Sequence, residues 1–153
     1  MTPEENIKQE LENKFPYLKE AVLIKRQGRM FLDVPQPHFF EVFDYLVKDL
    51  NFSHLCTITG IDEVNTFGVI YHLNKDGKII LNLKIHISHD EPKIKSVTSY
   101  FLEADAYERE LIDLLGIQVE GLSPGSRYPL PDNWPKDEHP LRKDWKPKEV
   151  ENA

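Results

Sequence analysis

Two carboxylates and two histidines are the side chains whose types and spacing come nearest to those of a reaction centre. Asp62 and Glu63 are adjacent and follow an apolar run, a place where a carboxylate can act as a general base. His86 and His89 are three residues apart, but no cysteine or clear third ligand accompanies them, so the pattern argues against zinc. We therefore interpret all four as polar residues of loops and exposed strand ends.

Other motifs of catalysis are missing from the sequence. The seven glycines are scattered singly, so neither GxGxxG nor GxxxxGK occurs. The single cysteine, Cys56, rules out an intrachain disulfide and an iron–sulfur cluster held by this chain alone, because such clusters commonly take four thiolates. Cys56 lies in the apolar run Leu55–Ile58, which predicts a buried side chain. These observations predict no catalytic, cofactor or metal site.

Residues 104–116 carry the start and stop signals of a helix. Asp105 suits the N-cap, and Glu108 three residues later completes a capping box. Gly116 is typical of a left-handed C-cap. We expect Arg109 and Asp113 to pair one turn apart. The polar side of this helix carries Arg109, Glu110 and Asp113.

The segment after this helix combines prolines with large apolar side chains. Six of the eleven prolines follow Gly116, and they discourage a helix or a central strand. Disordered segments are normally poor in aromatic residues, whereas this one contains Tyr128, Trp134 and Trp145. A stiff strip with aromatic anchors loses little entropy on docking to a partner. The residues themselves leave two alternatives open: docking on another protein, or packing on the chain's own domain.

Hydrophobic periodicity predicts an α+β fold, in which helices cover a largely antiparallel sheet and an extended Pro-rich tail follows. We expect one domain over residues 1–117 and a docking tail over 118–153. The predicted helices span residues 3–15, 38–50 and 104–115, and the predicted strands span 21–25, 30–34, 55–61, 67–73, 79–87 and, as a short edge strand, 96–101.

Bulk composition excludes several classes of partner. A net charge of −7 disfavours nucleic acid and anionic lipid. No apolar run approaches the roughly 18 residues that cross a bilayer, and the polar N-terminus is unlike a signal peptide. We therefore expect a cytoplasmic chain without a membrane span of its own.

Two blocks of the sequence, Tyr107–Ile117 and Pro140–Asp144, resemble the signature of the thirty-kilodalton subunit family of respiratory complex I. This family includes the matching subunits of energy-converting membrane hydrogenases. Beyond Gly121, the sequence of residues 122–135 is more similar to the hydrogenase-type branch of the family than to the respiratory branch. The matching positions are Glu108, Arg109, Glu110, Asp113, Gly116, Ile117, Gly121, Pro140, Leu141, Arg142, Lys143 and Asp144.

The resemblance implies a cofactor-free structural subunit in the peripheral arm of a membrane-bound, complex I-like oxidoreductase. The activity expected of that complex is ferredoxin-linked, hydrogenase-type electron transfer coupled to ion translocation. The implied partners are the large catalytic subunit and the cluster-bearing small subunit. Iron–sulfur clusters, and in a hydrogenase a NiFe centre, are expected in those partners. The chain would then lie on the cytoplasmic face of the cell membrane, held through its partners.

We hypothesise roles for the tail residues on this basis. Gly116 and Gly121 would turn the chain at the start of the tail, and a neighbouring subunit would take up the apolar anchors. Arginine pairs desolvated at such a contact are costly to break. The residues expected to bind the partner are Arg127, Tyr128, Trp134, Leu141, Arg142, Lys143, Asp144 and Trp145.

Three alternatives stay open. In the first, the chain is a subunit of a quinone-reducing NADH dehydrogenase-type complex. In the second, it is a soluble adaptor whose tail binds an unrelated partner. The third alternative is a free-standing small α+β enzyme that uses Asp62, His86 or His89 in a cleft.

Overall fold

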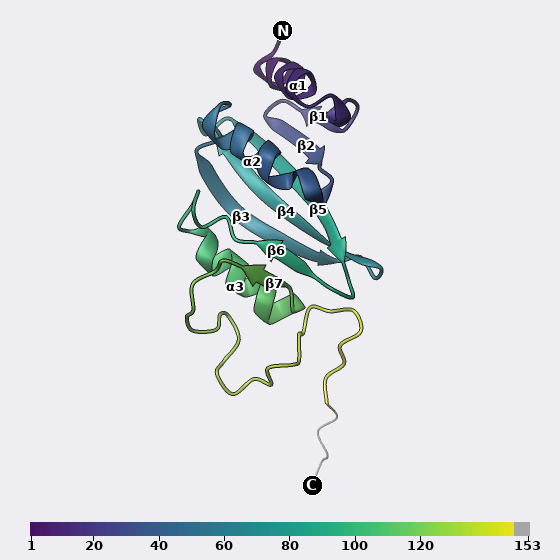
Figure 1. The fold of residues 1–153 in the computed structure, drawn as a ribbon, viewed down its shortest axis with the longest axis vertical. Coiled ribbons are helices and arrows are strands. Elements are labelled where there is room, and N and C mark those ends of the chain that lie inside the picture. The colour runs from purple at the N-terminus through teal and green to yellow at the C-terminus, as the bar shows by residue number, and fades with distance from the viewer. Residues whose placement is uncertain (149–153) are drawn as a thin grey trace.

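A five-stranded sheet with α-helices packed on it forms the centre of the fold (Figure 1). The computed structural model describes residues 1–148 and confirms the predicted α+β class with a largely antiparallel sheet. In chain order the elements are α1 (Pro3–Lys14), a 3-10 turn η1 (Pro16–Leu18), β1 (Val22–Arg26), β2 (Arg29–Asp33), η2 (Gln36–His38), α2 (Phe39–Lys48), β3 (His54–Asp62), β4 (Thr66–Lys75), β5 (Ile79–Ser88), β6 (Lys93–Lys95), α3 (Ala104–Leu115) and β7 (Gln118–Glu120).

The strands of the main sheet lie in the order β1-β2-β5-β4-β3. Neighbouring strands are antiparallel except β2 and β5, which run parallel with Met30 opposite Leu81. A parallel pair needs a long crossover, and α2, β3 and β4 lie between β2 and β5 in the sequence. Pro35 and Pro37 end β2 and begin that crossover.

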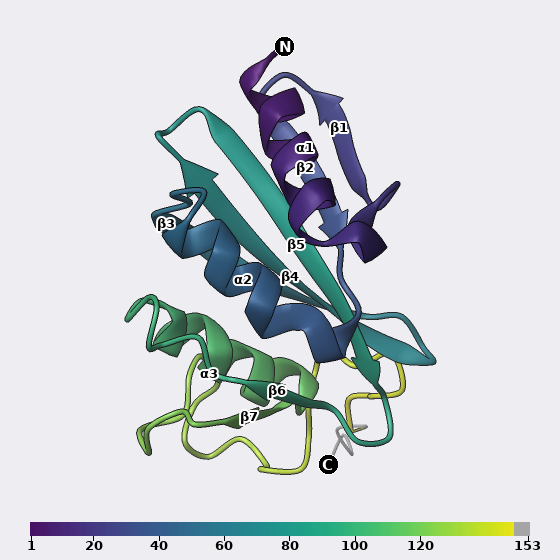
Figure 2. The ribbon, with the colours of Figure 1, turned by 45° about the horizontal axis from the view of Figure 1, so that its top comes forward.

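The sheet has one covered face and one open face. Along β5, Leu81, Leu83 and Ile85 are buried, whereas His86 is exposed. Figure 2 shows α1, α2 and α3 on the same side of the sheet, which is the covered side. The core is therefore a single layer between helices and strands. The rings of Phe39 and Phe43 from α2 lie 4.7 and 5.7 Å from the ring of Tyr71 on β4.

The N-terminal helix is fixed to the β1–β2 hairpin by a buried carboxylate. Thr2 and Glu5 form a capping box at the start of α1. Glu4 is buried and accepts a hydrogen bond from the backbone N–H of Gly28 at 2.6 Å. Gly28 has a φ of +73°, and a Cβ there would lie 2.6 Å from the carbonyl oxygen of Lys78, so this turn requires glycine.

Two local predictions are wrong. Residues 96–101 form no strand; β6 lies just before them and pairs in parallel with β7 in a separate small sheet. The Ser96 N–H still donates to the carbonyl of Glu120 on β7. The Ser96 hydroxyl interacts with the Thr98 hydroxyl and backbone N–H, and these local hydrogen bonds end the strand there. Cys56 is half-buried rather than buried, because a bulge in β3 between Leu55 and Thr57 breaks the alternation of its side chains.

Candidate functional site

The tail, defined as residues 121–148, runs back over α3 (Figure 1). Its first anchor is Asp113, a carboxylate of α3 that is only 5% exposed. Arg127 Nε donates to Asp113 Oδ1 at 3.2 Å, and the Leu130 N–H donates to Asp113 Oδ2 at 3.0 Å. Arg109 Nη2 donates to the carbonyl of Ser123 at 2.6 Å. Two helix side chains thus hold the first part of the tail.

The second anchor is the last turn of α3, whose carbonyls have no partner within the helix. His139 Nδ1 lies 2.9 Å from the carbonyl oxygen of Asp113. The Leu141 N–H donates to Leu114 at 3.0 Å, and Arg142 Nε donates to Leu115 at 2.7 Å. The partners of these three consecutive carbonyls are thus Leu141 and Arg142 of the second signature block and His139 just before it.

Gly116 makes this contact possible. It has a φ of +72° and is the predicted left-handed C-cap. A Cβ at this position would lie 2.7 Å from the ring of His139. Gly121 also has a positive φ, of +84°, where the chain turns out of β7 into the tail. Both glycines therefore have the left-handed backbone conformation that favours glycine.

The third anchor is Asp62 at the end of β3. Its side chain is buried, contrary to the predicted solvated loop, and Oδ2 accepts a hydrogen bond from the Lys143 N–H at 2.8 Å. His89 Nε2 lies 3.3 Å from Oδ1, and the His89 ring stacks on Phe67. Burial raises the pKa of Asp62, but the Lys143 and Val64 amides and His89 lower it overall.

Several side chains of the tail remain on the surface even though its backbone is held. Tyr128 is 50% exposed and Leu141 is 56% exposed. Lys143 and Asp144 are exposed, and Trp134 and Trp145 are half-buried with ring centroids 6.0 Å apart. The indole N–H of Trp145 is buried and has no hydrogen-bond partner among the described residues. Residues 149–153 of the predicted tail lie outside the described residues.

The predicted cap and ion pair of α3 are wrong. The N-cap is Glu103, without a side-chain hydrogen bond, and Asp105 lies in the first turn. Asp105 accepts two hydrogen bonds from Arg109, of 2.7 and 3.0 Å, and this pairing lowers the pKa of Asp105. Arg109 does not pair with Asp113, because the Asp113 carboxylate already binds the tail. Spacing alone allowed Arg109 a carboxylate one turn away on either side.

Glu108 is fully buried and caps no helix. Its Oε1 accepts hydrogen bonds from the Ser96 hydroxyl at 2.8 Å and the Val97 N–H at 3.1 Å. Its Oε2 and the Tyr71 hydroxyl are both buried without a partner among the described residues. Burial raises the pKa of Glu108 to about 7. This side chain fixes the turn before α3 from inside the core. Glu110, in contrast, is half-buried at the rim of a hollow between α3 and β3.

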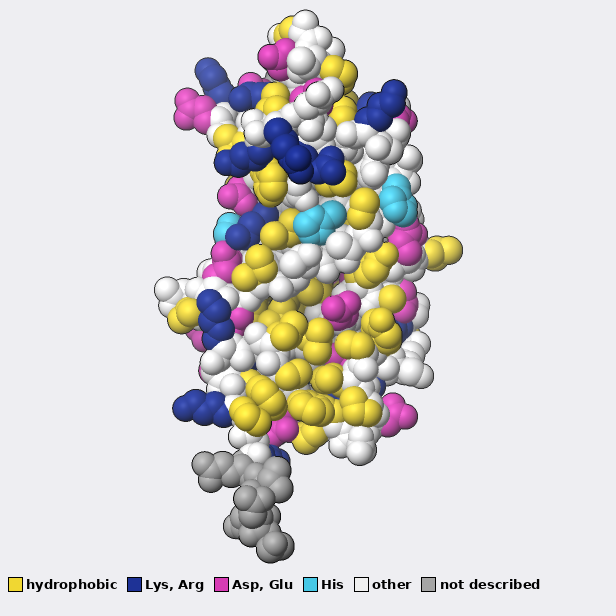
Figure 3. Space-filling model, turned by 180° about the vertical axis from the view of Figure 1, so that it is seen from behind, with side chains coloured by type: hydrophobic (Ala, Val, Ile, Leu, Met, Phe, Trp, Pro, Cys, Tyr) yellow, Lys and Arg dark blue, Asp and Glu magenta, His cyan; other side chains and the backbone are white. Residues whose placement is uncertain are grey.

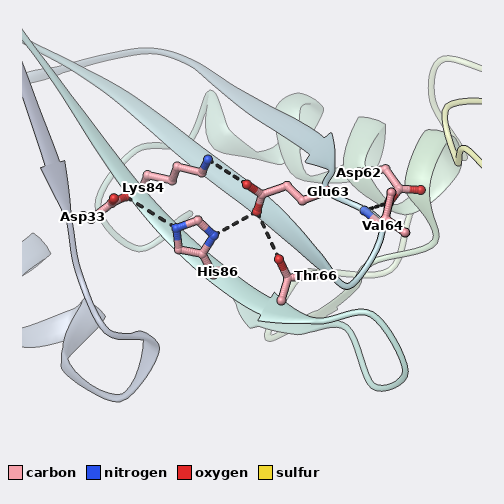
Figure 4. A network of polar contacts seen from close by, with 7 residues as sticks. All are labelled: Asp33, Asp62, Glu63, Val64, Thr66, Lys84 and His86. Carbon is pink, nitrogen blue, oxygen red and sulfur yellow. Dashed lines mark hydrogen bonds and ion pairs between the residues drawn. The ribbon is translucent and has the colours of Figure 1, made fainter.

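The remaining polar candidates form a network on the open face of the sheet (Figure 4). Glu63 Oε1 lies 2.8 Å from His86 Nδ1 and accepts from the Thr66 hydroxyl, and Oε2 accepts from Lys84 at 3.0 Å. His86 Nε2 lies 3.6 Å from Asp33. Burial raises the pKa of Glu63, but its bonds to Lys84 and His86 lower it overall.

The three residues of the hypothesised cleft, Asp62, His86 and His89, belong to two separate contacts. Asp62 pairs with His89, and Glu63 with His86. Each carboxylate is neutralised by structural donors, and the described residues contain no group of three or more side chains suited to a metal ion. None of the helices described is long and apolar enough for a membrane span. Sequence reasoning missed Asp62 and Asp113 as tail anchors, and local spacing carries no signal of these contacts.

The structure is therefore an α+β domain whose proline-rich tail is tied to its last helix. The comparisons agree: residues 32–151 match the sequence model described as the 30 Kd subunit of respiratory-chain NADH dehydrogenase. The chain belongs to this family. The family is one of subunits of multisubunit complexes, so the free-standing enzyme alternative is wrong.

Individual relatives cover most of the chain. It is 34% identical over 138 residues to a subunit of the F(420)H(2) dehydrogenase of Methanosarcina mazei, covering 88% of this chain and 87% of that one. It is 29% identical to a subunit of the NADH-quinone oxidoreductase of Moorella thermoacetica, covering 93% and 95%.

Two solved structures share the fold. A chain from the archaeal membrane-bound sulfane sulfur reductase has a TM-score of 0.80 at 24% identity, with coverage of 93% of this chain and 85% of the other. The trypsin-resistant fragment of Nqo5 has a TM-score of 0.62 at 25% identity, with coverage of 75% and 98%.

Proposed function

We propose that this chain is a cofactor-free assembly subunit in the peripheral arm of a membrane-bound, complex I-like oxidoreductase, and that its tail docks on a neighbouring subunit. The observation that carries the proposal is the contrast within the tail. Its backbone is tied to α3 through Asp113, while Tyr128 and Leu141 stay half exposed. A surface held in shape before docking loses little entropy when it binds.

The partners we propose are the large catalytic subunit and the cluster-bearing small subunit of the same complex. Those subunits would hold the iron–sulfur clusters and, in a hydrogenase, the NiFe centre. The chain would lie on the cytoplasmic face of the membrane, attached through these partners. The contact would use the half-buried Trp134 and Trp145, whose rings pack together, and the exposed Lys143 and Asp144.

The parent complex we favour is of the hydrogenase type, with ferredoxin-linked electron transfer coupled to ion translocation. Residues 122–135 support this choice, because they lack the sequence pattern typical of the respiratory branch. A quinone-reducing NADH dehydrogenase-type complex is the second candidate, favoured by the similarity to subunits of NADH-quinone oxidoreductases. Mass spectrometry of the purified complex would decide between them by identifying the large subunit.

The test is assembly of a truncated chain in its native complex. Deleting residues 122–153 should abolish co-purification with the large subunit. If the truncated chain assembles as tightly as the full chain, the proposal is wrong. Because the deletion also exposes carbonyls of α3, the double variant Tyr128→Ala/Leu141→Ala provides a milder comparison. Both side chains are surface-exposed, so this variant should fold normally. Its affinity for the complex should nevertheless fall at least about tenfold.

A further inference from the structure

The open face of the main sheet carries a second surface that the tail does not use. Figure 3 shows lysine and arginine side chains gathered across the upper part of this face, with hydrophobic side chains between them. We call this surface the basic open face. It is defined by Leu23, Lys25, Arg26, Arg29, Phe31 and Ile80, from β1, β2 and β5.

Apolar side chains stand out from the middle of this surface. Phe31 is 41% exposed and Leu23 is 44% exposed, and the two are cross-strand partners. Phe31 lines two hollows with volumes of about 500 and 270 Å³. The larger one is lined by Arg26, Arg29 and Cys56, among others. Aromatic side chains such as Phe, together with arginines, are enriched at protein interfaces.

The charge of this surface is opposite to that of the chain. Lys25, Arg26 and Arg29 have no ion-pair partner within 4.0 Å among the described residues. The whole chain carries a net charge of −7, so three uncompensated cations together are a local exception. Complementary charge at an interface directs the choice of partner.

We propose that the basic open face binds a neighbouring subunit of the same complex, one that presents apolar side chains bordered by carboxylates. This inference rests on the proposed function, because it assigns a second contact within that assembly. The tail lies over α3 and reaches the sheet at Asp62, on the strand farthest from β1. The two contacts can therefore be tested separately.

A second copy of this chain is a poor occupant of the basic open face. On the same face, Asp33 lines the smaller hollow and lies 3.6 Å from His86, and Glu63 is already bound by Lys84 and His86. Pairing two copies would place uncompensated cations of like sign close together without free carboxylates to balance them. An acidic surface on a different protein avoids this repulsion.

The first experiment uses the purified native complex. A carbodiimide, which joins amines to carboxylates without a spacer, should link Lys25 to an aspartate or glutamate of another subunit. Cys56 is the single cysteine of the chain and is half-buried in the larger hollow, so its alkylation by N-ethylmaleimide provides an independent measurement. We expect Cys56 to react at least about tenfold more slowly in the complex than in the isolated chain.

The second experiment reverses the charge. Lys25→Glu/Arg26→Glu/Arg29→Glu should weaken retention in the complex at least about tenfold, with a larger loss at low ionic strength. The matched control, Lys8→Glu/Lys14→Glu/Lys19→Glu, makes the same change of charge on the helical side and should assemble normally. Circular dichroism of each isolated variant verifies that it folds.

Several outcomes would overturn the inference. These are unchanged Cys56 reactivity in the complex, cross-links only between copies of this chain, and normal assembly of the Lys25/Arg26/Arg29 variant. Binding of the isolated chain to phosphatidylglycerol vesicles, lost in that variant, would assign the surface to lipid instead. If the tail proposal alone fails, the truncated chain still assembles while the charge-reversed chain does not. If only this inference fails, the reverse pattern is observed.

Discussion

Arg127 Nε lies 3.2 Å from Asp113 Oδ1, and this contact joins the first part of the tail to the last helix of the domain. The Arg127 Nη1 donates to the carbonyl of Trp134 at 2.6 Å. One arginine thus links α3 to the loop that carries the first tryptophan. The prolines of the tail limit its conformations, and the Asp113–Arg127 pair selects the one that lies over α3.

Removing the Asp113 carboxylate should release the tail. Asp113→Ala leaves Arg127 and the Leu130 N–H without their acceptor, and breaking a buried pair typically costs about 3–5 kcal/mol of unfolding free energy. Urea unfolding measures the loss, and trypsin cleavage after Arg127 should become faster. Asp105→Ala, which removes a more exposed pair on the same helix, should cost about 1 kcal/mol or less. Equal losses for the two variants would contradict the assigned role of Asp113.

At Gly60, β3 lies close against the side chains of α3. A Cβ there would lie 2.4 Å from Leu115 Cδ1 and 2.6 Å from Leu111 Cδ2. Gly60→Ala should therefore lower the unfolding free energy by about 1–3 kcal/mol through overpacking. In a double-mutant cycle, Leu115→Ala should cost less in the Gly60→Ala background than in the wild type. Additive effects would mean that the helix simply shifts away from the strand.

Buried Glu108 makes stability depend on pH. Its folded pKa of about 7 lies above the ordinary carboxylate value, so the folded state holds a proton that the unfolded state releases. The contribution of this proton to the unfolding free energy is about 3 kcal/mol. It is fully present below about pH 4.5 and is lost as pH rises to about 7. Glu108→Gln keeps a neutral amide and should lack this loss.

The measurement for Glu108 is the difference between the two unfolding curves at each pH. Wild type and Glu108→Gln share every other titrating group, so those contributions cancel. Between about pH 4.5 and 7, the unfolding free energy of Glu108→Gln should rise relative to that of the wild type. Above about pH 7 the difference between them should stay constant. Glu110→Gln, at a half-buried position two residues away on the same helix, is the control. A constant difference across this range would show that Glu108 ionises normally.

Asp62 should hold the end of the tail in the opposite pH range. Its lowered pKa means that its contribution to stability is present above about pH 4 and is lost as pH falls through the folded value. Asp62→Asn should speed amide hydrogen exchange at Lys143 at neutral pH, while exchange at Leu130, which binds Asp113, stays unchanged. Uniformly faster exchange in both places would indicate general destabilisation instead.

Patterns that repeat within one element were sufficient to predict most of the fold. The alternation along β5, the apolar stripe of α2 and the left-handed Gly116 follow from short-range sterics and burial, and the structure has all three. The two signature blocks were also sufficient to recognise the family.

The partners of polar side chains were beyond the reach of the sequence. Asp62 and Lys143 are 81 positions apart and Asp113 and Arg127 are 14 apart, so no periodic pattern connects them. Arg109 had a carboxylate one turn away on each side, and only the path of the tail left Asp105 as its partner. The sequence by itself determined the helices α1, α2 and α3, the strands of the main sheet and the proline-rich tail, because those properties depend on neighbouring residues. The tertiary structure alone decided that the tail lies over α3, because that outcome depends on which distant donors meet Asp113, Asp62 and the last carbonyls of the helix.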